Sequence, residues 1–139
     1  EIANRLRSEH GPSYLVEQLF NEAQQSGKNC VIESIRTEGE IDALRRRDKF
    51  FLIAVDADQK IRYERAMERK SETDSVTFQK FVEDENRELS STDPTKQNLR
   101  RCMELADYTI QNNSTIETLD AHVSEIVNEI EKSGKKRKK

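Results

Sequence analysis

The stretch that decides the fold is NCVIESIR, at residues 29–36. Its apolar centre predicts a short buried strand that ends by presenting Glu33 and Arg36, and a new helix is expected from Thr37. A second apolar run, FFLIAVD at residues 50–56, ends in the same way and leads into another helix. Open α/β sheets place ligands at the carboxyl ends of such strands. The two stretches together predict an α/β domain that handles phosphate.

Helical patterns surround these strands. Apolar residues that share one face predict helices at 13–26, 37–44 and 59–70, and a last helix with an apolar stripe from Ile116 to Ile130. The run YTI at 108–110 predicts a third short strand. Strands that alternate with helices, without hairpin turns, indicate a mainly parallel sheet covered on both faces. Three strands are few for such a sheet.

Charge is abundant but balanced. The 139 residues contain 24 Lys and Arg against 27 Asp and Glu, which leaves a net charge of −3. A domain that binds nucleic acid is usually basic throughout, so this composition argues against nucleic acid as the partner. A run of five basic residues lies at 135–139, and we expect a disordered tail at 132–139.

No apolar run approaches the roughly 20 residues that a membrane span needs. A secretory signal pattern is also missing, so the sequence predicts a cytoplasmic protein without a membrane partner. Cys30 lies in a predicted strand and Cys102 in an apolar helix stripe, and both are expected to be buried free thiols. The sequence has no CxxC and no His/Cys cluster, which argues against a metal site.

Three arginines follow the second predicted strand at intervals of three and four residues: Arg62, Arg65 and Arg69. At this spacing they share one face of a helix. Guanidinium groups on one face suit a polyphosphate, because each offers a planar fork to phosphate oxygens. The spacing alone nevertheless favours the other reading, an exposed helix with ion pairs to neighbouring carboxylates.

Charged residues also lie near the first predicted strand. Glu33 stands at its tip, where burial needs a partner. Either Glu33 orients a nucleophile or a metal-bound water while Arg36 holds an acceptor phosphate, or Glu33 pairs with Arg36 or with another helix and ties the loop. Arg5 and Arg7, next to His10, form a basic patch that suits an acceptor phosphate and a solvated helix end equally well.

Asn112 and Asn113 follow the third predicted strand. They contact a base edge or, as the residue types favour, make the turn into the last helix. The sequence contains no GxxxxGK followed by Ser or Thr, and its four glycines do not cluster. Its own residues therefore do not form the backbone nest that usually holds a triphosphate.

Several short motifs occur together in this chain: RSEHGPSY at 7–14, VIESIR at 31–36, AVDAD at 54–58 with RYER at 62–65, DPTKQN at 93–98, and ADY at 106–108 with NN at 112–113. As a set they resemble the P-loop nucleotide kinases, in particular the dephospho-CoA-kinase-like and adenylate-kinase-like predicted nucleotide kinases. The resemblance covers nearly the whole chain except the lysine tail.

The resemblance implies transfer of the γ-phosphoryl group of ATP, with Mg²⁺, to a small nucleotide-like phosphorylated acceptor. It implies a catalytic role for Arg65 and Arg69, which would neutralise the transferred group. Arg62, Asn112 and Asn113 would bind the ATP, with the asparagines near its adenine.

On the same resemblance, Arg5, Arg7, Glu33 and Arg36 would bind the acceptor. The domain would span residues 1–131, and its lid would lie at about 68–89.

The family's first strand and phosphate loop have no counterpart in this sequence. In the family, that strand lies between those that match 29–35 and 50–56, so we expect a three-layer sheet with a gap and two apolar edges. An N-terminal segment or a second copy of the chain would complete the sheet, and catalysis would be weak without it.

The alternative function is a non-catalytic kinase-like binding or regulatory module. In some relatives such a segment precedes a deoxycytidylate-deaminase-like domain, although this sequence carries no deaminase motif.

Overall fold

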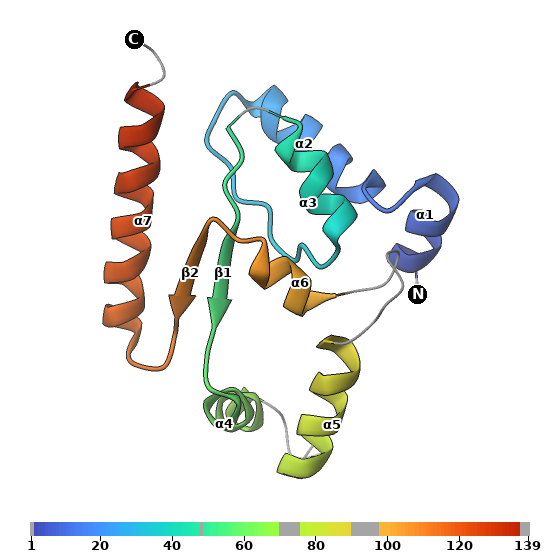
Figure 1. The fold of residues 1–139 in the computed structure, drawn as a ribbon, viewed down its shortest axis with the longest axis vertical. Helices are drawn as coiled ribbons and strands as arrows, with labels where there is room; N and C mark the ends of the chain where they lie inside the picture. Colours follow the sequence, from blue (N-terminus) through green and yellow to red (C-terminus); the bar gives the residue numbers. More distant parts are fainter. Residues whose placement is uncertain (1, 48, 70–75, 90–97, 137–139) are drawn as a thin grey trace. The chain divides into compact units, whose positions relative to one another are not determined.

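The computed structural model describes residues 2–47, 49–69, 76–89 and 98–136. The elements run in the order α1 (Ile2–His10), α2 (Tyr14–Ser26), α3 (Glu38–Arg45), β1 (Ile53–Asp56), α4 (Gln59–Arg69), α5 (Phe78–Leu89), α6 (Leu99–Glu104), β2 (Tyr108–Gln111) and α7 (Ile116–Lys136) (Figure 1).

The chain separates into two compact units. The first comprises residues 1–52 and 87–105, and the second comprises 53–86 and 106–139. Each unit is composed of two stretches of sequence.

The sheet consists of two parallel strands. Strand β1 pairs with β2, with Ile53 opposite Tyr108 and Asp56 opposite Gln111. Because the strands are parallel, both end at the same edge, where the Asn112 N–H donates to the Asp56 carbonyl at 2.7 Å. This pairing confirms the mixed α/β class and two of the predicted strands, although β1 is shorter than the run at 50–56.

Residues 29–35 do not form the predicted strand. They run without regular secondary structure between α2 and α3, and within the described residues no backbone hydrogen bond joins them to another segment. Val31 is 94% exposed, and Ser34 has a left-handed φ of 65°. An apolar run forms a strand only where a neighbour satisfies its backbone groups, and the described residues supply none.

This difference also corrects one prediction about the cysteines. Both thiols are free, as expected, but Cys30 is exposed whereas Cys102 is buried. Cys30 was expected to be buried because it lies in the run predicted to form a strand. The structure leaves that run unpaired, and the thiol is exposed. Burial in α6, with Glu40 and Glu38 nearby, raises the pKa of the Cys102 thiol to about 11.

The core of the first unit is helical. Helix α2 packs on α3, α1 on α2, and α6 on α3. The most buried side chains include Ile41 and Leu44 of α3 and Val16 of α2. Helix α3 begins at a cap, since the Thr37 hydroxyl accepts the Glu40 N–H at 3.3 Å.

The second unit packs helices around the two strands. Ala54 and Ile110 point into its core, and α7 contacts β2. On α4, the Tyr63 ring makes edge contacts with Phe78 and Phe81 of α5, with centroids 5.3 and 5.4 Å away. These aromatic contacts attach α5 to α4.

The expected lid at 68–89 comprises the end of α4 and the whole of α5, and its residues 70–75 lie outside the described part. Helix α7 continues to Lys136, so the described part of the expected disordered tail at 132–139 is helical. Residues 137–139 are not among those described. None of the described helices combines the length and apolar character needed to cross a membrane.

Candidate functional site: an arginine-lined pocket

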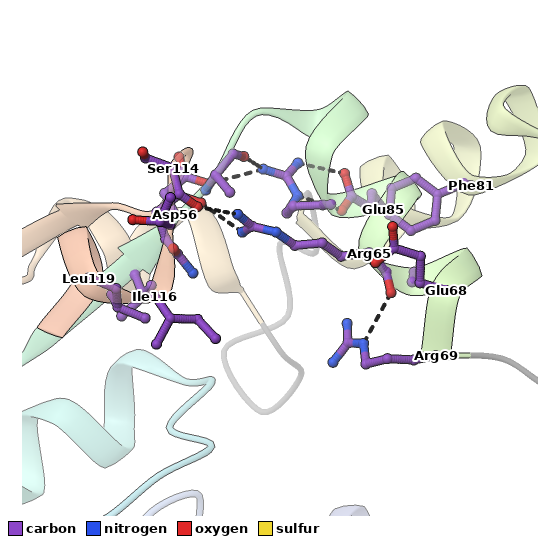
Figure 2. A pocket seen from close by; sticks show the side chains of 15 residues that line it. Asp56, Arg65, Glu68, Arg69, Phe81, Glu85, Ser114, Ile116 and Leu119 are labelled. Atoms are coloured by element: carbon purple, nitrogen blue, oxygen red, sulfur yellow. Dashed lines mark hydrogen bonds and ion pairs between the residues drawn. The ribbon is translucent and has the colours of Figure 1, made fainter.

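The second unit contains a pocket with a volume of about 780 Å³ (Figure 2). It is lined by the end of β1, by α4 and α5, and by the segment between Asn112 and Leu119. Its size lies within the range of small-molecule sites, and its location at the carboxyl ends of parallel strands is the usual place for a ligand in an α/β sheet.

All three arginines of α4 line this pocket. The helix begins at Gln59, directly after β1 and a two-residue connection. Its 3.6-residue period therefore brings Arg62, Arg65 and Arg69 to the face that borders the strand ends. Among the described residues, none of the three arginines forms an ion pair with Asp58, Glu64 or Glu68, the neighbouring carboxylates that the spacing favoured.

Arg62 has its charge compensated by two carboxylates. Its Nε and Nη2 donate to the two oxygens of Glu85 at 2.9 and 2.7 Å, and its Nη1 donates to Asp56 Oδ1 at 3.0 Å. Nη1 also donates to the Ala57 carbonyl. The hydrogen bond with Glu85 raises the pKa of Arg62 above its ordinary value, and the same bond lowers the pKa of Glu85.

Arg65 joins α4 to the loop after β2. Its Nη1 donates to the Asn112 carbonyl at 2.7 Å, and its Nη2 donates to the Ser114 carbonyl at 3.2 Å. These acceptors are neutral. The Arg65 side chain is therefore held in position in the pocket without an opposing charge from any described carboxylate.

Arg69 is the most exposed of the three. Its Nε donates to the Arg65 carbonyl at 3.3 Å, and no described carboxylate contacts its guanidinium. In Figure 2, Ile116 and Leu119 lie on one side of the pocket and Arg69 on the other. The pocket thus offers both cationic and apolar surface to a ligand.

The asparagines after β2 have different surroundings. Asn113 Oδ1 accepts the Asp58 N–H at 2.7 Å, and its Nδ2 donates to Asp58 Oδ1 at 3.2 Å. Asn113 therefore connects this loop to the start of α4. Asn112 lines the pocket.

The remaining predicted site residues belong to the first unit. Arg7 is buried and its Nε donates to Glu40 Oε1 at 3.0 Å, while Arg5 forms an exposed pair with Glu9 at 3.3 Å. The two arginines therefore do not form a common basic patch on the surface. His10 stacks on Tyr14, with ring centroids 4.5 Å apart.

Glu33 is exposed and Arg36 is half-buried. Among the described residues they form no ion pair with each other. A Glu33–Arg36 pair, one alternative for this loop, is therefore not formed within the described part of the chain. The Arg36 backbone is held on both sides: its N–H donates to Glu40 Oε2 at 3.0 Å, and its carbonyl accepts the Asn98 N–H at 2.9 Å. Glu40 thus contacts both Arg7 and the backbone of Arg36.

Sequence reasoning missed Glu85 as a member of the site. Glu85 lies one helical turn after Phe81, and both side chains line the pocket. That spacing was the available signal, because residues four apart share a face of a helix. Among the described residues, no group of three His, Cys, Asp or Glu side chains is placed to hold a metal ion.

Comparison with known proteins identifies similar chains. A UPF0200 protein of Methanothermobacter thermautotrophicus is 29% identical over 134 residues, which cover 95% of this chain and 67% of the relative. A UPF0200 protein of Methanocaldococcus jannaschii is 29% identical over 137 residues, covering 94% and 66%. One from Saccharolobus solfataricus is 26% identical over 137 residues, covering 96% and 70%. No family model matches the chain.

Proposed function

We propose that this chain is a nucleotide-binding, kinase-like domain whose arginine-lined pocket takes the phosphate groups of ATP. The observation that carries the proposal is the pair Arg65 and Arg69, which line the pocket and contact no described carboxylate. Guanidinium groups stay charged at all ordinary pH values and match the geometry of phosphate oxygens. The apolar side of the pocket, at Ile116 and Leu119, suits the base.

The proposed reaction is transfer of the γ-phosphoryl group to a small phosphorylated acceptor. Arg65 and Arg69 would stabilise the negative charge on the group in transit. Arg5, Glu33 and Arg36 would bind the acceptor, and the buried Arg7 would help to position Arg36 through Glu40. Mg²⁺ would enter bound to the ATP phosphates.

The proposal includes a larger sheet. Among the described residues, β1 is paired along one edge only, and residues 29–35 have no strand partner. Exposed apolar side chains lie on both segments, with Val31 94% and Val55 56% exposed. A further strand, from an N-terminal segment or a second copy of the chain, would pair with both segments and complete a three-layer P-loop-kinase-like sheet.

A binding module without catalysis is the second candidate. The compensated charge of Arg62 and the lack of a phosphate-loop motif in this sequence favour it. Transfer of labelled γ-phosphate from ATP to AMP, dCMP or dephospho-CoA separates the two. Transfer supports the kinase, whereas nucleotide binding without transfer supports the module.

Substitution of Arg69 tests the site itself. Arg69→Ala should weaken Mg-ATP binding about tenfold, because a charged hydrogen bond contributes about 1.5–3 kcal/mol and 1.4 kcal/mol is a factor of ten. Isothermal titration calorimetry measures the dissociation constants. Lys60→Ala is the matched control, since Lys60 is an exposed cation of the same helix outside the pocket lining.

The control should bind Mg-ATP like the wild type. Equal affinity of wild type and Arg69→Ala would remove Arg69 from the site. A wild-type chain that binds neither Mg-ATP nor tripolyphosphate would refute the proposed function.

A further inference from the structure

Glu85 accepts hydrogen bonds from two nitrogen atoms of the Arg62 guanidinium. The Nε and Nη2 groups of Arg62 each donate to a different oxygen of the Glu85 carboxylate, at 2.9 and 2.7 Å. Gln59 Nε2 donates to the same carboxylate at 3.0 Å. Both ionic side chains are largely covered, at 33% exposure for Arg62 and 20% for Glu85.

This arrangement is the one that a guanidinium offers to a phosphate. Two parallel N–H groups bind two oxygens of a carboxylate or of a phosphate with the same geometry. Glu85 and Arg62 both line the pocket that contains Arg65 and Arg69. The Glu85 carboxylate therefore lies where a phosphate group of a bound ligand would contact Arg62.

The charges of the pocket lining also indicate that Glu85 competes with an anionic ligand. Three arginines are matched by three carboxylates: Asp56, Glu68 and Glu85. A pocket with balanced charge attracts a polyanion weakly unless one of its carboxylates moves away. Glu85 is the one whose two oxygens both bind the same arginine of the pocket.

We propose that Glu85 is an internal competitor for the anionic ligand, so that a ligand phosphate must displace its carboxylate from Arg62 to bind fully. This inference rests on the proposed function, because it assumes a phosphate-bearing ligand. The ring contacts of Tyr63 with Phe78 and Phe81 do not involve the Glu85 side chain. Displacement therefore releases the part of α5 around Glu85 and leaves its first turn attached to α4.

The test compares tripolyphosphate binding by the wild type and Glu85→Gln. Glutamine keeps the size of the side chain and an oxygen acceptor for Arg62, but it removes the competing charge. The variant should bind tripolyphosphate about fivefold to tenfold more tightly, a change of roughly 1 kcal/mol that calorimetry resolves. Mg-ATP should show the same direction.

Glu83→Gln is the control for the loss of one negative charge on α5. Glu83 is exposed, accepts a hydrogen bond from Gln79 at 3.3 Å, and does not line the pocket. Its substitution should leave the affinity unchanged. An equal gain in both variants would show a general charge effect and would overturn the inference.

A double-mutant cycle with Arg62→Ala identifies the subsite. If Glu85 competes for Arg62, then Glu85→Gln should improve binding in the wild-type background and give no gain when Arg62 is absent. Hydrogen exchange adds a second readout. Tripolyphosphate should speed exchange in the second half of α5 in the wild-type chain.

The outcomes separate the two proposals. If the wild type binds tripolyphosphate and folded Glu85→Gln binds it no more tightly, the inference is wrong and the proposed function stands. If only Glu85→Gln binds, both are supported. If neither chain binds tripolyphosphate or Mg-ATP, both are refuted. Should Glu85→Gln fail to fold, Glu85→Asp, whose shorter side chain retreats from Arg62, provides the same comparison.

Discussion

At the residue scale, Glu40 joins two segments of the first unit. One of its oxygens accepts from the buried Arg7 at 3.0 Å, and the other accepts the Arg36 N–H at 3.0 Å. The Glu40 N–H donates to the Thr37 hydroxyl, which caps α3. The side chains of Arg7 and Glu40 are only 8% and 4% exposed. Such a pair is expensive to break, because removal of one partner leaves a buried charge without compensation.

Glu40→Gln should therefore destabilise the protein by about 3–5 kcal/mol, the usual cost of breaking a buried ion pair. Urea unfolding followed by circular dichroism measures the change. The exposed pair Arg5–Glu9 provides the control, and Glu9→Gln should cost no more than about 0.5 kcal/mol. A loss below about 1 kcal/mol for Glu40→Gln would mean that solvent reaches Arg7 in solution.

At the element scale, two apolar runs of similar sequence pattern form different structures. The run at 50–56 contributes β1, which pairs with β2, whereas the run at 29–35 remains unpaired among the described residues. The side chains reflect this contrast. Ile110 of β2 is 3% exposed, and Val31 is 94% exposed.

Substitutions in the paired strands and in the unpaired run should therefore have unequal effects on stability. Ile110→Ala should cost about 2–5 kcal/mol, because it leaves a cavity in a packed core. Val31→Ser should change the free energy of unfolding by less than about 0.5 kcal/mol, as is usual for an exposed position. Urea unfolding of both variants gives the comparison. A large loss for Val31→Ser would indicate that this side chain is covered in solution by a strand partner.

At the scale of the whole molecule, the candidate residues divide between the two units. The pocket and its arginines belong to the second unit, while Arg5, Glu33 and Arg36 belong to the first. In the proposed function, the nucleotide donor and the acceptor would therefore be held by different units of one chain.

Hydrogen exchange with and without ligands tests this division. ATP should protect the end of β1, α4 and the loop after β2, because these segments form the pocket. An acceptor such as AMP or dCMP should instead protect the segment that contains Glu33 and Arg36. At a ligand concentration of about 100 times the dissociation constant, binding adds roughly 2.7 kcal/mol of stability, which is enough for clear protection. Protection by ATP confined to the first unit would contradict the proposed site.

Local sequence predicts much of the helical structure. Gly27, with its left-handed φ of 66°, ends α2, and Thr37 caps α3, both at the predicted positions. The spacing of Arg62, Arg65 and Arg69 places all three on one face of α4, and the structure places that face along the pocket. At the start of α7, the Thr115 hydroxyl accepts the Thr118 N–H and caps the helix.

The sequence by itself therefore determined the helices, their caps and the shared face of the arginines, because these depend on residues within a few positions of one another. Only the tertiary structure decided which apolar run formed a strand and which carboxylate paired with which arginine. Glu85 lies 23 residues from Arg62, and Glu40 lies 33 residues from Arg7. A strand needs a neighbour for its backbone, and a buried charge needs a partner brought to it by folding, so neither can be deduced from its own segment alone.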